Sequence, residues 1–251
     1  MAGHAFVLHL LRATARRENA HALLARCGTE GEIWPAVDGR AMTSADLDAC
    51  ANDTLFTPAY PFGLKTGEIG CFLSHRQIWA EIVRRDLDYG LIFEDDVAID
   101  PGPYAGAVRL AVRHAPTFHY IQLQNRPPER TGPVIDHDGD STLRVPVVSS
   151  LRASAQLVTR TAAAHLLALS EVFDRPVDTF VQSHWQTGLR PAAIYPAGIA
   201  TISDQLDGST IQSGKKTLGQ RLYREVARGL YRARVRRCSA QSTAPRNGGL
   251  T

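Results

Sequence analysis

The sequence lacks the features that mark membrane, secreted and repetitive proteins. In its 251 residues, no apolar run approaches the ~20 residues that a membrane-spanning helix needs. The apolar segment 5–11 is too short for a signal peptide and is soon followed by arginines. The four cysteines form no Cys-x-x-Cys pair, and no internal repeat or low-complexity segment occurs. We therefore expect a soluble, cytoplasmic protein with reduced thiols, without a disulfide framework or a zinc site.

Acidic residues are scarce near the C-terminus. Residues 215–237 hold nine Lys or Arg and one acid, Glu225, which gives this stretch a net charge of +8. Because the whole chain carries +3, the remainder carries −5. We predict one domain over residues 1–214, a basic amphipathic helix over 215–237 and a disordered tail over 238–251.

The alternation of segments in the first half indicates the fold class. A strand pattern over residues 6–10 precedes an Ala- and Arg-rich helical pattern over 12–26, and a second strand pattern covers 32–37. This β-α-β order favours right-handed crossovers between parallel strands. We predict an α/β fold, a Rossmann-like and mostly parallel sheet flanked by helices.

A short apolar segment that ends in three carboxylates is the most informative stretch. Residues 89–93 read as a strand buried on both faces, and Glu94, Asp95 and Asp96 follow at once. Side chains alternate along an extended segment, so Glu94 and Asp96 share one face and Asp95 points to the other. Two carboxylates at the carboxyl end of such a strand suit a divalent cation, Mg²⁺ or Mn²⁺ rather than zinc. The alternative is a surface turn or helix N-terminus that tolerates the acids.

Other polar side chains are expected near the same edge of the sheet. His9 and Asp38 stand at the ends of the first two predicted strands, although a turn role would also explain each of them. A strong helical pattern begins at Thr66 and carries Ser74 and His75 in its first turns, where free N–H groups favour hydroxyl or phosphate ligands. His75 alone would equally suit a hydrogen-bonded packing histidine.

Several segments together resemble glycosyltransferase family 25, the family of bacterial lipooligosaccharide galactosyltransferases and of collagen galactosyltransferases. The resemblance extends over roughly residues 5–200. It rests on the segments AVDGR (36–40), GEIGCFLSH (67–75), LIFEDDV (91–97), LVTR (157–160) and PVD (176–178).

This resemblance implies a GT-A-like fold, a UDP-sugar donor (most often UDP-galactose), Mn²⁺ or Mg²⁺, a saccharide or glycolipid acceptor and inversion to a β-linkage. The chain departs from the family pattern at His9 and Gln156, where Asn and Tyr are common, so the resemblance implies the reaction type more strongly than the sugar.

Roles for single residues follow from the residues and the resemblance together. Glu94 and Asp96 are the predicted metal ligands. Inversion needs a base opposite the leaving group, for which Asp178 is the first candidate and Asp204 the second; helix capping is the other role that Asp178 could have. Substrate contacts are expected from seven residues: His9, Arg12, Asp38, Glu68, Ser74, His75 and Asp95.

The basic segment near the C-terminus predicts a separate function. Leu218, Leu222, Val226 and Leu230 recur every four residues beside arginines, as in helices that lie on anionic membranes. We expect attachment to the inner face of the membrane, with a helix packed on the domain as the alternative. A nucleic-acid binder is not expected, because the body is acidic and no reading motif is present. A sugar-binding protein without turnover and a phosphoryl transferase are further alternatives.

Overall fold

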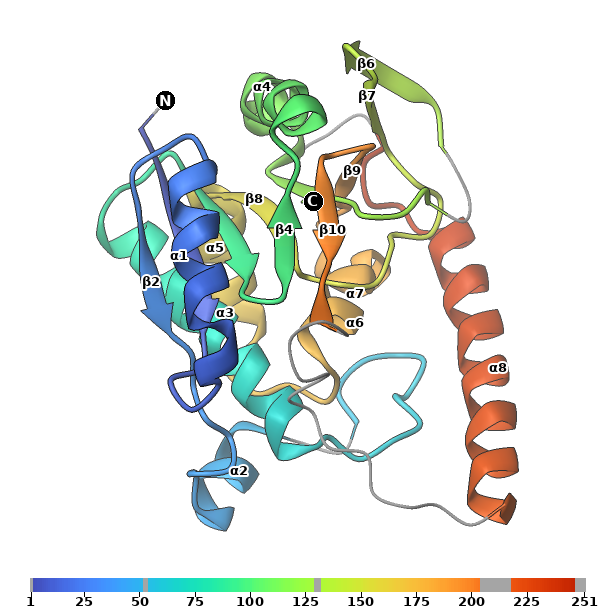
Figure 1. Cartoon of the computed structure of the whole chain (residues 1–251). Helices are drawn as coiled ribbons and strands as arrows, with labels where there is room; N and C mark the ends of the chain where they lie inside the picture. The colour runs from blue at the N-terminus through green and yellow to red at the C-terminus, as the bar shows by residue number, and fades with distance from the viewer. Residues whose placement is uncertain (1, 52–53, 129–131, 204–217, 247–251) are drawn as a thin grey trace.

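A computed structural model describes residues 2–51, 54–128, 132–203 and 218–246 (Figure 1). A mixed eight-stranded sheet in the order β2-β1-β3-β8-β5-β9-β7-β6 forms its centre. The predicted α/β class is confirmed. The strands are β1 (Gly3–His9), β2 (Gly31–Pro35), β3 (Tyr89–Glu94), β5 (Tyr120–Leu123), β6 (Val134–Asp138), β7 (Ser141–Arg144), β8 (Ala155–Thr159) and β9 (Ala192–Tyr195).

Parallel pairing holds the first half of the sheet together. β1 pairs in parallel with β2 and with β3, and β5 with β9. β8 is inserted antiparallel between β3 and β5, and β7 pairs antiparallel with β9 and β6. Burial on both faces explains why β1, β3 and β8 are nearly continuous apolar runs.

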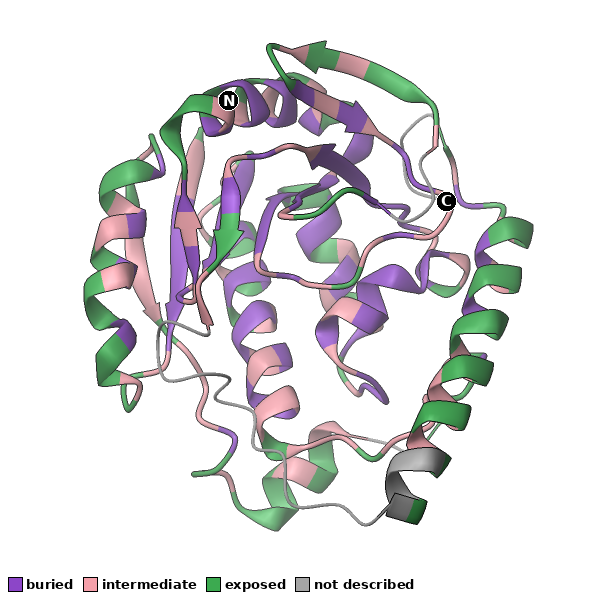
Figure 2. Cartoon of the chain, turned by 45° about the vertical axis from the view of Figure 1, so that its right-hand side comes forward, coloured by how far each residue is buried: buried purple, intermediate pink, exposed green. Residues whose placement is uncertain are grey.

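Helices cover both faces of the sheet (Figure 2). α1 and α4 pack on one face, where Leu23 and Leu110 are fully buried. α3, α5 and α6 pack on the other, where Trp79 and Phe180 are buried. The helices are η1 (Thr14–Arg16), α1 (Arg17–Arg26), α2 (Ser44–Cys50), α3 (Thr66–Arg84), α4 (Pro101–Phe118), α5 (Arg160–Leu169), α6 (Val177–Gln182), α7 (His184–Thr187) and α8 (Leu218–Gln241). Among the described helices, none is long and apolar enough to cross a bilayer.

The glycines of two sequence motifs allow α3 to approach the loop after β2. A Cβ atom on Gly70 would lie 2.5 Å from the Val37 carbonyl oxygen, and one on Gly39 would collide with the Thr66 carbonyl oxygen. Ser74 fixes the same crossing, because its Oγ accepts from Val37 N (2.8 Å) and donates to the Gly70 carbonyl oxygen (2.7 Å). These motif residues therefore fix the backbone of the loop after β2 against α3.

Two regions differ from the sequence-based expectation. The segment 124–140 is rich in polar residues, a composition typical of a loop, but it contains β6, which pairs with β7 at the edge of the sheet. The predicted tail from residue 238 continues α8 to Gln241 and then contacts the body: Ser242 Oγ lies 2.8 Å from His184 Nδ1, and Arg190 Nε donates to the Ala244 carbonyl oxygen (3.2 Å). Polar contacts with the buried side chains of His184 and Arg190 hold Ser242 and Ala244 against the body.

A buried arginine ties three parts of the chain together. Arg175 is fully buried and forms two hydrogen bonds with Asp174 (2.6 and 2.9 Å). It also donates to the carbonyl oxygens of Phe56 (2.9 Å) and Pro58 (3.1 Å) and to the Tyr231 hydroxyl (3.2 Å). The loop around residue 57 and helix α8 are thereby held against α6.

Replacing this arginine is expected to destabilise the protein strongly. Burial raises the pKa of Asp174, but Arg175 and the amides of Phe56 and Leu55 outweigh burial and lower it below its ordinary value. Arg175→Met would leave a buried charge without its main partner, which costs about 3–5 kcal/mol of unfolding free energy. The control Arg84→Met removes only an exposed ion pair and should cost about 1 kcal/mol or less. Urea denaturation measures the unfolding free energy of both variants. If Arg84→Met lowers it as much as Arg175→Met does, the role assigned to Arg175 is wrong.

His184 makes the segment after α8 sensitive to acid. His184 is buried, and its Nε2 lies 3.3 Å from Arg190 Nη1, a nitrogen that only donates, so Nε2 accepts and Nδ1–H donates to Ser242. Burial, with the Arg190 charge, lowers the pKa of His184 to about 3. The unfolded chain, with an imidazole pKa near 6.5, therefore binds more protons than the folded chain between these values.

Stability should consequently fall as the pH drops below about 6.5 and continue to fall toward pH 3. His184→Gln retains a polar side chain without a basic group, so its unfolding free energy should depend less on pH in this window. Urea titrations at a series of pH values measure this difference. Identical pH profiles for the two proteins would show that His184 does not titrate as described.

Candidate active site

The acidic cluster lies at the carboxyl end of β3, in the middle of the sheet. Asp95 is buried against β1 and η1. Its Oδ2 lies 2.8 Å from His9 Nδ1, and its Oδ1 accepts from Arg16 Nη1 (3.0 Å). Asp95 is thus fully engaged in fixing the turn. Residues 95 and 96 form this turn, and Asp96 Oδ2 also lies 3.5 Å from Arg16 Nη1, so the predicted alternation does not extend past Glu94.

The environment of Glu94 disfavours the ionised form of its carboxyl group. Burial, followed by the charges of Asp96 and Asp178, raises the pKa of Glu94 to about 8. Beside it lies Cys71 Sγ, which is 3.7 Å from Glu94 Oε1; burial and the Glu94 charge raise the pKa of this thiol. A cation bound beside Glu94 would favour the ionised form of its carboxyl group.

A small second sheet positions Asp96. β4 (Val97–Ile99) pairs antiparallel with β10 (Ile199–Thr201), and the Asp96 carbonyl oxygen accepts from Ile202 N (2.9 Å). The Asp96 side chain accepts from Ser203 Oγ (2.7 Å), and its Oδ2 lies 3.5 Å from Arg16 Nη1. Asp96 keeps partial solvent exposure, so one side of its carboxylate faces outward.

Glu94 and Asp96 offer carboxylate oxygens, the ligand type that Mg²⁺ and Mn²⁺ prefer. Burial, followed by the charges of Asp96 and Asp178, raises the pKa of Glu94. Cys71, His75 and Glu94 also converge within 4.8 Å, but this group fits a metal poorly. His75 Nδ1 is 3.0 Å from the Cys71 carbonyl oxygen and Nε2 is 3.3 Å from that of Ala153, so a backbone carbonyl oxygen lies in front of each ring nitrogen.

Asp178 approaches the cluster from α6. The segment 152–154 contacts both Glu94 and Asp178. The Ser154 carbonyl oxygen accepts from Glu94 N (2.9 Å), and Arg152 N donates to Asp178 Oδ2 (3.2 Å). Asp178 Oδ1 accepts from the amide of Thr179 (2.6 Å). The N-cap of α6 is Pro176, so Asp178 does not occupy the capping position. The second base candidate, Asp204, lies outside the described residues.

The remaining predicted substrate residues separate into two groups. Asp38 Oδ2 accepts from Arg12 Nε (2.7 Å) at a partly exposed position near the end of β2, and the Arg12 hydrogen bond lowers the pKa of Asp38. In contrast, Glu68 closes a capping box with Lys65 N (2.8 Å), and His75 is fully buried, where burial lowers its pKa. Glu68, Ser74 and His75 thus act on the helix and its packing.

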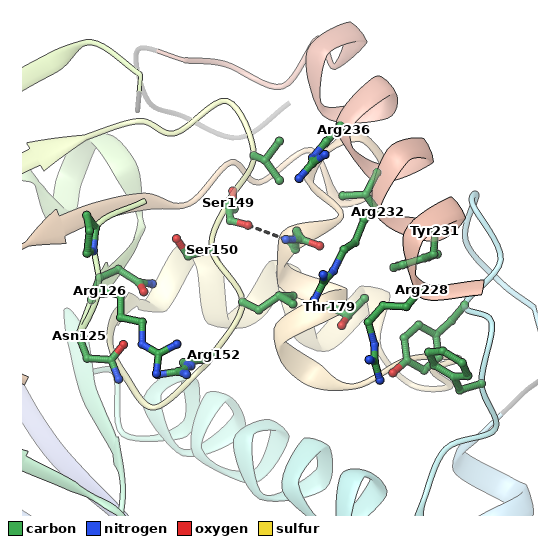
Figure 3. A pocket seen from close by; sticks show the side chains of 18 residues that line it. Asn125, Arg126, Ser149, Ser150, Arg152, Thr179, Arg228, Tyr231, Arg232 and Arg236 are labelled. Carbon is green, nitrogen blue, oxygen red and sulfur yellow. Dashed lines mark hydrogen bonds between the residues drawn. The ribbon is translucent and has the colours of Figure 1, made fainter. Parts of the chain in front are cut away.

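Sequence reasoning missed two arginines of the site. Arg16 forms ion pairs with Asp95 and Asp96. In the sequence it is one of several arginines in a helical pattern, so nothing distinguishes it as a residue of the site. Arg152 has a φ of +84°, an unusual backbone conformation for a residue other than glycine. Its amide binds Asp178, and its side chain extends into a neighbouring cavity, where Nη1 donates to Thr201 Oγ1 (3.4 Å). Figure 3 shows this cavity.

Helix α8 forms one wall of that cavity, which encloses about 320 Å³. Tyr231 and Val235 face the body, whereas Tyr223, Val226 and Leu230 are 68%, 55% and 58% exposed. The predicted basic helix is thus present and is partly packed on the domain, and the described members of its apolar stripe, Val226 and Leu230, face outward.

Comparisons with known proteins place this geometry in context. A family model described as Glycosyltransferase family 25 (LPS biosynthesis protein) matches residues 2–127. A "Glycosyltransferase 25 family member" of Drosophila melanogaster is 31% identical over 215 residues, which cover 76% of this chain and 35% of the fly protein. Procollagen galactosyltransferase 2 of Homo sapiens is 38% identical over 100 residues, covering 38% of this chain and 16% of its own.

A human relative with an equal match carries a different description. "Inactive glycosyltransferase 25 family member 3" of Homo sapiens is 41% identical over 100 residues, covering 38% of this chain and 16% of its own length. The chain therefore spans about a third or less of the length of these curated relatives.

Proposed function

Because this chain belongs to glycosyltransferase family 25, we propose that it is a metal-dependent, inverting enzyme that transfers galactose from UDP-galactose to a saccharide acceptor. One observation supports the proposal: Glu94 lies at the carboxyl end of β3, where burial, followed by the charges of Asp96 and Asp178, raises its pKa. Ligands of open α/β sheets bind at this edge. The acceptor we propose is a lipopolysaccharide or lipooligosaccharide core, in line with the description of the family model.

The donor side of the site is built on β1 and β3. Glu94 and Asp96 are the residues that would hold Mn²⁺ or Mg²⁺, which when bound stabilises the negative charge of the departing diphosphate. Asp95, clamped by His9 and Arg16, fixes the turn between these two ligands. Arg12 and Asp38 lie near the end of β2, where they would bind the nucleoside part of the donor.

The acceptor side is built on α6 and the segment before β8. In the proposed reaction Asp178 accepts the proton of the acceptor hydroxyl as the new glycosidic bond forms at the anomeric carbon. The amides of Arg152 and Thr179 hold its carboxylate in one orientation. A positioned base of this kind contributes roughly 10²–10⁴-fold to the rate.

A sugar-binding protein without turnover is the second candidate, because one human relative is described as inactive. A donor screen separates the two. Each common UDP-sugar is incubated with Mn²⁺ and a lipooligosaccharide core oligosaccharide, and UDP release is followed. The enzyme should release UDP fastest from UDP-galactose and only when acceptor is present. Binding of sugars without UDP release from any donor would establish the second candidate.

We further propose that α8 attaches the protein to the inner, anionic face of the membrane. Its exposed apolar side chains and arginines match the composition of interfacial helices. Each apolar side chain contributes about 1.5–3 kcal/mol when buried, so Val226→Ser with Leu230→Ser should weaken binding to phosphatidylglycerol vesicles at least about tenfold. Val134→Ser, at an exposed position on β6, is the control. Unchanged sedimentation of the double variant would contradict attachment through α8.

A further inference from the structure

The cavity beside Asp178 is lined by five arginines from three separate parts of the chain (Figure 3). We call it the arginine cavity. Arg126 follows β5, Arg152 precedes β8, and α8 presents the other three at intervals of four residues, which places them on one face of the helix. These three are Arg228, Arg232 and Arg236. Among the described residues that line the cavity, none is acidic.

Two of the five arginines, Arg126 and Arg232, have no acidic partner within the described chain. Arg228 pairs with Glu225, and Arg152 donates to a threonine hydroxyl. Arg126 and Arg232 are exposed and have no carboxylate within ion-pair distance in the part of the chain that the structure describes. Like charges that converge on one space repel each other, and an anion placed between them would reverse the sign of that interaction.

The cavity also contains a buried polar group that lacks a partner. Ser149 is fully buried and lines the cavity, and its Oγ has no hydrogen-bond partner among the described residues. The neighbouring Gln182 Nε2 is already used by the Ser149 carbonyl oxygen (2.6 Å). Buried hydroxyls are nearly always hydrogen-bonded, so an unpaired one at a cavity wall indicates a place for a polar ligand atom.

The other lining groups fit a sugar that carries the anion. Tyr60, Phe62 and Tyr231 supply aromatic surface, and the volume of about 320 Å³ is at the lower end of the range for small-ligand sites. Guanidinium groups match phosphate and carboxylate oxygens through paired hydrogen bonds. The lining therefore combines apolar contacts for a ring with cationic contacts for an acidic substituent.

The cavity adjoins the acceptor side of the proposed reaction. Thr179 and Arg152 line it, and their amides are the two that hold the Asp178 carboxylate. We propose that the arginine cavity is an acceptor subsite that binds a phosphate or carboxylate group on the acceptor saccharide. This inference rests on the proposed function. Four of the five arginines lie beyond residue 127, where the family match ends, so most of the cationic groups of the subsite lie outside the matched region.

Equilibrium binding tests the subsite without any transfer reaction. Calorimetry with the full chain compares glucose 6-phosphate, glucose, inorganic phosphate and phosphatidylglycerol vesicles. Glucose 6-phosphate should bind more tightly than either glucose or inorganic phosphate. Arg126→Ser and Arg232→Ser should each weaken this binding about tenfold or more, as expected for one charged hydrogen-bonding group. Arg234→Ser removes the same charge from an exposed position outside the cavity and should change binding less than twofold.

Three results would overturn the proposal. If glucose and glucose 6-phosphate bind alike, or Arg234→Ser weakens binding as much as the cavity variants, the cavity does not recognise the anion. If UDP displaces glucose 6-phosphate competitively, the cavity belongs to the donor diphosphate. If only the vesicles bind through Arg126 and Arg232, the ligand is a lipid headgroup. Failure of the proposed function would look different, because the sugar phosphate would still bind while no UDP-sugar is consumed.

Discussion

Asp178→Asn is expected to lower the rate of transfer by roughly 10²–10⁴-fold, the usual contribution of a positioned general base. The amide keeps the shape of the side chain, and its oxygen can still accept from the Thr179 amide. It cannot take the proton of the acceptor hydroxyl. Steady-state kinetics with saturating donor measure the effect on kcat, and calorimetric titration with UDP should show donor binding within about twofold of the wild type.

Asp48→Asn is the matched control, since this exposed residue of α2 loses the same charge away from the site. Its kinetic constants should equal those of the wild type. Near-normal turnover of Asp178→Asn would show that Asp178 is not the general base. Asp204 would then be the candidate for this role.

Asp96→Asn is expected to abolish most activity, by about 10²-fold or more, because it removes a proposed ligand of the cation that stabilises the negative charge on the leaving group. Addition of EDTA to the wild type should cause a comparable loss that excess Mn²⁺ reverses. Stability should not fall, since the substitution removes one of the charges that raise the pKa of Glu94. That pKa should move down toward its ordinary value.

Thermal unfolding and turnover together measure this variant. A marked loss of stability would show that Asp96 holds the turn and is not a ligand. Full turnover of the wild type in EDTA would contradict the metal assignment itself.

The sequence predicts the buried strand that leads to the site, because this feature depends on local geometry. The apolar run forms β3 and ends at Glu94, but residues 95 and 96 form a turn, so the alternation expected for three acids stops there and Asp95 and Asp96 both approach Arg16. The strand and helix pattern likewise predicted the layered fold. These features follow from period and burial within a few residues of chain.

Features that depend on contacts between distant segments were beyond such reasoning. The insertion of β8 antiparallel between β3 and β5 leaves no mark on its apolar sequence. The apolar stripe predicted for α8 faces outward where it is described, because Tyr231, Val235 and Ser239 make the contacts with the body. The arginine cavity gathers side chains more than 100 positions apart in the sequence.

Motif membership also does not distinguish chemistry from packing. Gly39, Gly70 and Ser74 belong to the most recognisable segments, yet they serve the close crossing of α3 over the loop after β2. Glu68 and His75 occupy helix-capping and buried positions. Only the three-dimensional arrangement separates these residues from Glu94, which is buried within the influence of the Asp96 and Asp178 charges.

The configuration of the product tests the account most directly. Wild-type protein is incubated with UDP-galactose, Mn²⁺ and a lipooligosaccharide core oligosaccharide, and the product is examined by NMR for the coupling constant of its new anomeric proton. The donor is α-linked, so inversion with Asp178 as base predicts a new β-linked galactose residue. An α-linked product, or release of free galactose with no new saccharide, would contradict the account.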